Sequence, residues 1–167
     1  MKLSITNITL FIIFIFSDNH GLFAEETWLQ YTYVGYVSSI AEEADYIWIG
    51  TEGGGLVQMN KITNEKTFYN TSNSSLPDND VWSIAIESNG EKWMGTDGGL
   101  AKFDGKNWTI YDPSNSGLPG SDVRSIAIDD NGNKWIGTSM DGLAKFDGEI
   151  WTVYNTSNSE LPSKRVF

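Results

Sequence analysis

Residues 123–128 read VRSIAI, and residues 134–138 read KWIGT. Near-copies of these stretches occur earlier in the chain, as VWSIAI at 81–86, KWMGT at 92–96 and IWIGT at 47–51. The copies place three tryptophans 45 and 42 residues apart, at Trp48, Trp93 and Trp135. A period of this length, with several short apolar stretches in each period, is typical of the blades of a β-propeller. The repeat therefore predicts an all-β propeller.

The last full repeat is expected to contain four strands. Residues 123–128 are largely apolar on both faces, which indicates a strand that is buried on both sides. An Asn-Gly turn at 131–132 leads to a second strand at 134–138. The third and fourth strands are expected at 143–147 and 151–154, where residues on the two faces alternate. Four antiparallel strands, with the first most buried, describe a blade whose inner strand lines the propeller axis.

The repeats divide the chain into three predicted blades at 36–77, 78–119 and 120–162. Residues 25–35 resemble the fourth strand of a repeat and are predicted to form an outer strand without a blade of its own. Residues 163–167 are predicted to begin a further blade. A closed ring usually needs four to eight blades. We therefore predict an incomplete, open ring that is the front part of a longer propeller; the alternative is that two or three chains assemble one ring.

Two residues of the second strand are expected to be structural in every repeat. The tryptophans Trp48, Trp93 and Trp135 are predicted to pack between adjacent blades. The glycines that follow two residues later are predicted to allow a close approach by a neighbouring side chain or backbone: Gly50, Gly95 and Gly137.

The N-terminal residues 1–24 differ in character from the repeats. Lys2 precedes an apolar run at 8–16, which is too short to span a bilayer as a helix, and Ala24 offers a small residue for cleavage. We predict a secretory signal peptide, with an uncleaved membrane anchor as the alternative. The mature chain is then expected in the periplasm or outside a bacterial cell, without membrane insertion.

Signal removal would leave few residue types for catalysis. His20 is the only histidine, and the chain has no cysteine. The mature chain would therefore lack histidine base catalysis, thiol chemistry and the usual zinc ligands. We expect a protein that is not an enzyme and that uses no cofactor or metal. The formal net charge of -11 also argues against nucleic acid as a partner.

The repeat resembles a known family. The stretches 118–119, 123–129, 132–138 and 142–147 together are similar to the two-component regulator propeller repeat, and residues 76–104 repeat the pattern closely. The resemblance implies the extracytoplasmic, ligand-binding part of membrane-spanning regulators, often hybrid histidine kinases or diguanylate cyclases, some of which sense oligosaccharides. In that family more blades, a β-sandwich, a membrane helix and signalling domains follow. None of these follows in this sequence.

Two groups of residues are candidates for ligand binding. Trp82 and Arg124 occupy one position of the inner strand, where the first repeat has Ser38, and they would suit stacking on a sugar ring and binding a carboxylate or hydroxyl. The alternative is a channel-lining position that tolerates many residues. Carboxylates lie beside glycines at corresponding places in the three repeats, at Glu52, Asp97 and Asp141. They could bind sugar hydroxyls or a cation, or could simply be turn residues.

Three functions remain open from the sequence. The first is a non-catalytic binding module that senses a small molecule or oligosaccharide, with the remaining propeller blades or a second copy of itself as protein partner. The second is a carboxylate-based enzyme acting on polysaccharides, which needs two acids at hydrolase spacing. The third is a surface scaffold for protein interaction.

Overall fold

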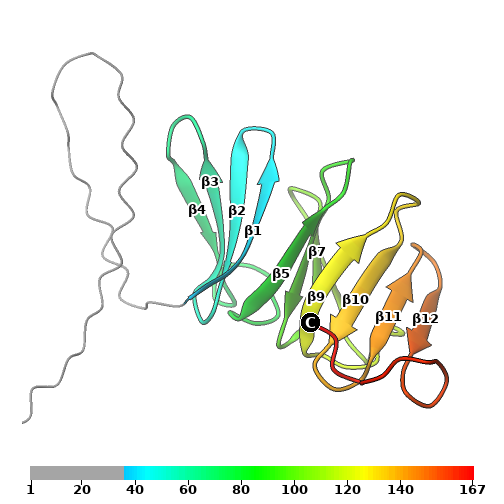
Figure 1. Ribbon diagram of the computed structural model, residues 1–167. Helices are drawn as coiled ribbons and strands as arrows, with labels where there is room; N and C mark the ends of the chain where they lie inside the picture. Colours follow the sequence, from blue (N-terminus) through cyan, green and yellow to red (C-terminus); the bar gives the residue numbers. More distant parts are fainter. Residues whose placement is uncertain (1–35) are drawn as a thin grey trace, which may run out of the picture. The chain divides into compact units, whose positions relative to one another are not determined.

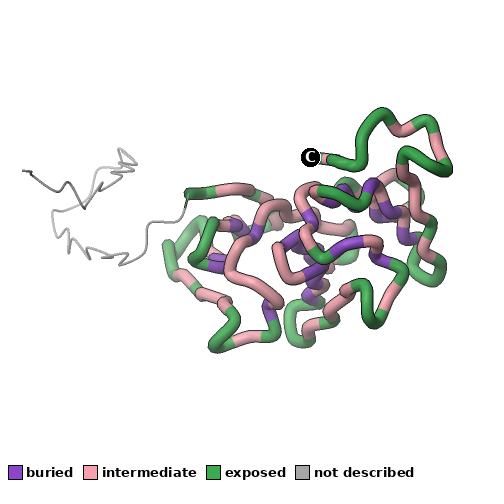
Figure 2. Tube along the Cα trace, turned by 90° about the horizontal axis from the view of Figure 1, so that it is seen from below, coloured by how far each residue is buried: buried purple, intermediate pink, exposed green. Residues whose placement is uncertain are grey.

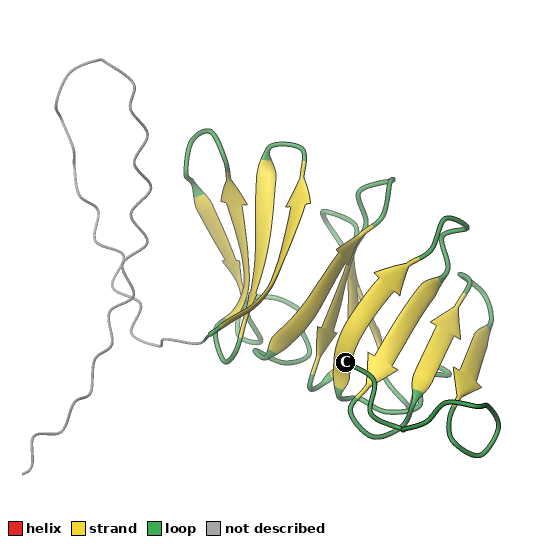
Figure 3. Ribbon diagram, in the orientation of Figure 1, coloured by secondary structure: helices red, strands yellow, loops and turns green. Residues whose placement is uncertain are grey.

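The structure is a computed structural model that describes residues 36–167 (Figure 1). The predicted signal peptide at 1–24 and the predicted outer strand at 25–35 lie outside the described residues. Within residues 36–167 the regular elements are all strands (Figure 3), as the sequence predicts. No helix in this part of the chain is long and apolar enough to cross a membrane.

The twelve strands form three four-stranded antiparallel sheets, each made of strands that follow one another in the chain. Blade 1 contains β1 (Val37–Glu43), β2 (Tyr46–Thr51), β3 (Gly55–Asn60) and β4 (Lys66–Tyr69). Blade 2 contains β5 (Val81–Ile86), β6 (Lys92–Thr96), β7 (Gly99–Phe103) and β8 (Trp108–Tyr111). Blade 3 contains β9 (Val123–Ile128), β10 (Lys134–Thr138), β11 (Leu143–Phe146) and β12 (Trp151–Tyr154). The all-β, four-stranded blades expected from the repeat are confirmed.

The blades pack face to face, with their first strands side by side: β1 lies next to β5, and β5 lies next to β9 (Figure 1). We call the face of a blade that meets the following blade its trailing face, and the opposite face its leading face. Figure 2 shows the buried residues in the interior and the exposed residues mainly in the outer loops, and the buried hydrophobic residues form two clusters. The core of the protein therefore consists of two layers between blades.

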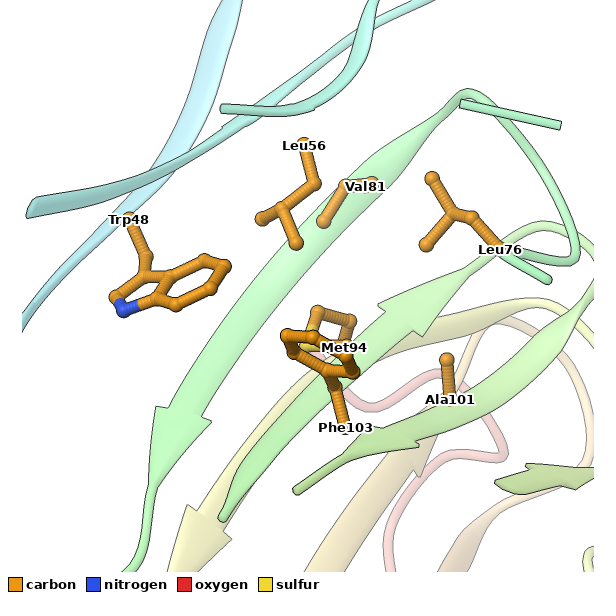
Figure 4. Packing of buried hydrophobic residues seen from close by; sticks show 7 residues of the cluster. All are labelled: Trp48, Leu56, Leu76, Val81, Met94, Ala101 and Phe103. Atoms are coloured by element: carbon orange, nitrogen blue, oxygen red, sulfur yellow. The ribbon is translucent and has the colours of Figure 1, made fainter. Parts of the chain in front are cut away.

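Each core layer joins residues of two blades. Between blades 1 and 2, Trp48 and Leu56 of the trailing face meet Val81, Met94 and Phe103 of the leading face (Figure 4). The layer between blades 2 and 3 repeats this arrangement with the corresponding residues, which include Trp93, Leu100, Val123, Ile136 and Phe146. Apolar burial of this kind is the main favourable term in folding.

The second-strand tryptophans differ in burial. Trp48 and Trp93 are both 1% exposed, whereas Trp135 is only half-buried. The glycines behave alike in the three blades: a Cβ on Gly95 would lie 2.7 Å from Val123 Cγ1 and 2.8 Å from its carbonyl oxygen. These glycines therefore permit the close approach of the next inner strand.

An ion pair accompanies the tryptophan in each layer between blades. Lys134 of blade 3 reaches back to Glu87 of blade 2, with Nζ 2.8 Å from Oε1, and Trp93 Nε1 donates to the same carboxylate at 2.6 Å. Lys92 and Glu43 make the corresponding pair at 2.7 Å between blades 2 and 1. Both lysines are buried, so each ion pair connects one blade to the next at a place that is largely shielded from water.

Candidate functional site

A β-bulge interrupts the first strand of every blade near its beginning. The ladder pairs Val81 with Thr96 and then Ser83 with Gly95, so Trp82 has no partner across the strand. The same shift leaves out Ser38 in β1 and Arg124 in β9. A bulge bends a strand and re-aims the side chain at the extra residue, and bulges are frequent next to functional sites.

Two bulge residues meet across the boundary between blades 2 and 3. The guanidinium carbon of Arg124 lies 4.2 Å from the centroid of the Trp82 ring, which is the distance of a cation–π contact. Trp82 Nε1 donates a hydrogen bond to Asp97 Oδ1 at 2.5 Å, and Arg124 Nη2 lies 3.2 Å from the same oxygen. The structure therefore brings together three of the five ligand-binding residues predicted from the sequence.

Asp122 is a further member that the sequence analysis missed. Arg124 Nε lies 2.5 Å from Asp122 Oδ1, and Arg124 Nη2 donates to Asp122 Oδ2 at 3.0 Å. The sequence contained a hint of this residue, because the preceding repeat has an aspartate, Asp80, at the corresponding position. That aspartate instead accepts a hydrogen bond from the backbone N–H of Gly53 at 2.5 Å. We call Trp82, Asp97, Asp122 and Arg124 the bulge cluster.

The two carboxyl groups of the bulge cluster have opposite pKa shifts. Burial raises the pKa of Asp97, against the lowering effects of its hydrogen bond from Trp82 and of the Arg124 charge. Burial opposes ionisation of Asp122 too, but hydrogen bonds from Arg124 and Ser139 outweigh it and lower the pKa of this group. One arginine thus serves two acids, and the cluster carries a net negative charge when both are ionised.

Glu52 and Asp141 lie outside the bulge cluster, and both are exposed. The backbone N–H of Asp141 donates to Thr138 Oγ1 at 3.0 Å, as expected of a turn residue. The expectation that Glu52, Asp97 and Asp141 occupy corresponding places is wrong. Glu52 and Asp97 follow the last residue of the second strand directly, where blade 3 has Ser139; Asp141 stands two residues further along a longer loop.

The geometry of the bulge cluster fits binding better than hydrolysis. Asp97 Oδ1 and Asp122 Oδ2 both lie next to Arg124 Nη2, at 3.2 and 3.0 Å, so the guanidinium group occupies the space between the two carboxyls. Retaining glycosidases hold their two carboxyls about 5–5.5 Å apart, and inverting enzymes hold them further apart. In the bulge cluster the space between the two carboxyls is filled by Arg124. Within residues 36–167, no group of three or more histidine, cysteine, aspartate or glutamate side chains is arranged to hold a metal ion.

Comparison with known proteins confirms the repeat. Residues 117–140, which cover the end of one connection, β9 and β10, match the sequence profile of the family described as "Two component regulator propeller". Among curated proteins, none matches this chain in sequence. The family resemblance inferred from the sequence is therefore confirmed for this segment.

Solved structures with the same fold include extracellular sensor domains. The extracellular domain of BT3049 from B. thetaiotaomicron, described as a hybrid two component system, is 26% identical, with a TM-score of 0.66 over 77% of this chain and 18% of that one. The corresponding domain of BT4673 from the same organism is 20% identical, with a TM-score of 0.60 over 74% of this chain and 17% of that one. This chain spans less than a fifth of the length of these two extracellular domains.

The same fold also occurs in proteins of other functions. Streptogramin B lyase is 17% identical, with a TM-score of 0.57 over 73% of this chain and 42% of the lyase. PorZ, a surface component of the type-IX secretion system of Porphyromonas gingivalis, is also 17% identical, with a TM-score of 0.57 over 78% of this chain and 22% of PorZ. The fold alone therefore does not decide the function.

Proposed function

We propose that this chain is a ligand-binding segment of an exported, two-component-type sensor propeller, and that it recognises a small molecule or an oligosaccharide at the bulge cluster without chemical turnover. The similarity to extracellular domains of hybrid two component systems supports the sensor context. The bulge cluster supports the position of the site. It is a half-buried group of aromatic, cationic and acidic side chains that two bulges direct away from the strand ladder.

The observation that carries the proposal is the contrast among the three bulge residues. Ser38, Trp82 and Arg124 share one backbone position, yet they differ completely in chemistry. Ser38 and Arg124 each contact a neighbouring blade, Ser38 at the carbonyl oxygen of Val81 and Arg124 at Asp97, yet they do so with different chemistry, whereas the second-strand position is a tryptophan in every blade. A serine, an indole and a guanidinium at one end of three neighbouring inner strands instead provide a surface that varies around the axis. Such variation suits recognition of a ligand that lies across several blades.

The chemistry of the bulge cluster suits a saccharide. Indole rings stack on the apolar faces of sugars, and carboxylate and guanidinium groups bind hydroxyls through charge-assisted hydrogen bonds. The side chains are already ordered by contacts with one another, because Arg124 is held by Asp97, Asp122 and the Trp82 ring. This order reduces the entropy that must be lost when a ligand binds.

Titration of the 15N-labelled protein with neutral and uronic-acid oligosaccharides tests the proposal. We expect chemical-shift changes at Trp82 Nε1–H and at the amides of β5 and β9 for at least one sugar. Arg124→Gln should weaken the response at least about tenfold, the effect of losing a charged hydrogen bond. Arg165→Gln provides the matched control, because this exposed arginine lies outside the cluster. A response that Arg124→Gln leaves unchanged would place the site elsewhere.

The opposite pKa shifts of Asp97 and Asp122 are the one observation that favours a polysaccharide-cleaving enzyme, since acid–base pairs show such shifts. The guanidinium group of Arg124, which lies between the two acids, opposes it. Product analysis of the same sugars separates the two functions. Cleavage that Asp97→Asn abolishes would support the enzyme and contradict the proposal of a binding module.

A further inference from the structure

The trailing face of blade 3 repeats the trailing faces that are buried in blades 1 and 2. Each face contains a tryptophan from the second strand, a leucine from the third strand or its start, a tyrosine from the fourth strand and a leucine from the following connection. The residues of blade 3 are Trp135, Leu143, Tyr154 and Leu161, and they line an open groove of about 410 Å³. In blade 2 the corresponding residues are Trp93, Leu100, Tyr111 and Leu118.

The two faces differ in what covers them. Leu100 is 0% exposed and Leu118 is 2% exposed, because blade 3 packs on them. Leu143 and Leu161 remain partly exposed in the part of the chain that the structure describes. The aromatic residues already have the orientation of the buried face: Trp135 and Tyr154 stack with centroids 5.9 Å apart, compared with 5.7 Å for Trp93 and Tyr111. The aromatic side chains of this face therefore adopt the arrangement of the buried face without a covering blade.

An acidic residue, Asp129, also lies on this face. Trp135 Nε1 donates to Asp129 Oδ2 at 3.0 Å, as Trp93 Nε1 donates to Glu87. Glu87 pairs with Lys134 from the following blade, and Glu43 pairs with Lys92 in the same way. Asp129 has no lysine from a following blade among the described residues. By analogy, the missing ion-pair partner of Asp129 is a lysine from the second strand of a following blade.

The last residues of the chain already follow the path of an incoming inner strand. The N–H of Val166 donates to the carbonyl oxygen of Thr138 at 3.0 Å. A Cβ on Gly137 would meet Val166 Cγ1 at 2.7 Å and its carbonyl oxygen at 2.8 Å, the same distances that separate Gly95 from Val123. Val166 therefore occupies, on blade 3, the position with which β9 begins on blade 2.

We propose that the trailing face of blade 3 is a docking surface for one kind of partner: a further propeller blade whose second strand carries lysine directly before its tryptophan. Such a blade continues the inner strand from the position of Val166, covers Trp135 and Leu143, and pairs its lysine with Asp129. The specificity comes from the charge, because the apolar part of the face would accept any aliphatic surface of similar shape.

A second copy of this chain does not meet this requirement. Its blades 2 and 3 have their leading faces buried, so only blade 1 could dock. Blade 1 has Ile47 opposite Glu42, where blade 3 has Lys134 opposite Ile128. The charge of Glu42 is already paired with Lys61, whose Nζ lies 2.6 Å from Oε1, so this face offers Asp129 no lysine from its second strand.

Thiol labelling tests the proposal, because the chain contains no cysteine of its own. A blade is added by replacing Val166 and Phe167 with a copy of residues 123–162, in the full chain carrying Leu143→Cys. We expect labelling of this thiol to slow about tenfold or more when the blade is added, and the melting temperature to rise by about 4 °C or more. Leu100→Cys, at a site that is already buried, should label slowly with or without the added blade.

A charge variant of the added blade tests the specificity. An added copy carrying Lys134→Glu places a glutamate against Asp129, and we expect it to lose most of the protection of Leu143→Cys. Equal protection by both copies would overturn the lysine requirement. Unchanged labelling with a folded added blade would overturn the docking surface. Concentration-dependent protection of Leu143→Cys in the chain without an added blade, matched by a dimer in sedimentation, would overturn the proposal in favour of a second copy.

Discussion

Blades 2 and 3 present nearly the same residues on their trailing faces, and only one of these faces is closed. Trp93 and Trp135 each stack on a tyrosine of their own blade and donate to the acid that directly follows their own first strand. Trp93 is 1% exposed, whereas Trp135 is half-buried. The comparison shows that a blade sets the orientation of its tryptophan by itself, while the following blade supplies the burial and therefore most of the stability.

The largest difference is expected from removing the two tryptophans. Trp93→Ala should lower the free energy of unfolding by about 3–5 kcal/mol, because it opens a cavity between two blades. Trp135→Ala should cost only about 1 kcal/mol, because solvent already reaches this side chain. Urea unfolding followed by far-UV circular dichroism measures both. Equal costs for the two variants would contradict the contrast between a closed and an open face.

The lysines provide the next test. Lys134→Met removes the partner of Glu87 in a buried site, and we expect a loss of about 3 kcal/mol. Lys145→Met changes a lysine of the open face that lies 5.6 Å from the Trp135 ring, and its effect should stay within about 0.5 kcal/mol. The same denaturation experiment compares them. A large loss from Lys145→Met would mean that the open face is already an organised interface.

A smaller difference is expected from the two glycines. Gly95→Ala forces a methyl group against Val123 in the middle of the protein, and overpacking of this kind costs about 2 kcal/mol. Gly137→Ala meets Val166, which is partly exposed and belongs to no strand of the described residues, and the hydroxyl of Ser125, which can rotate. We therefore expect about 1 kcal/mol for Gly137→Ala. A larger cost at Gly137 would indicate that Val166 is held as firmly as Val123.

The smallest effect concerns the acid of the open face. Hydrogen bonds from Asn133 and Trp135 lower the pKa of Asp129 to about 2, from a usual value of 3.8. A lowered pKa adds stability above the usual value, and this part is lost as the pH falls from 3.8 through about 2. Asp129→Asn should therefore flatten the acid side of the stability curve slightly. NMR titration of the carboxyl carbon measures the pKa directly, and a value near 3.8 would contradict the contacts described.

Much of the fold could be predicted from the sequence, because each strand carries a local signal. The Asn-Gly turn and the apolar stretch before it define β9 and β10 at the predicted residues. The third strand ends at Phe146, one residue before the predicted end, because Asp147 belongs to the turn and accepts hydrogen bonds from Glu149 and Ile150. These features depend on residues close together in the chain.

The candidate site was harder to predict, because it depends on contacts between repeats. Asp97 and Asp122 are 25 residues apart, and only the packing of blade 3 on blade 2 brings them to one arginine. The counterpart of Asp122 in blade 2, Asp80, accepts a hydrogen bond from the backbone N–H of Gly53 in the preceding blade, so it has a different role. Asp141 was misplaced because a loop one residue longer shifts it out of the position that Asp97 occupies.

The bulge at the start of each inner strand has a consequence for how such a protein can change. The bulge residue takes no part in the ladder, so its replacement leaves the pairing of the strand intact and changes only its contacts with the neighbouring blade, such as the one from Arg124 to Asp97. Ser38, Trp82 and Arg124 show that residues of very different size and charge fit there. The strand ladder is therefore encoded by other residues of the same repeat, so a blade can change the chemistry at its bulge while its strand pairing stays the same.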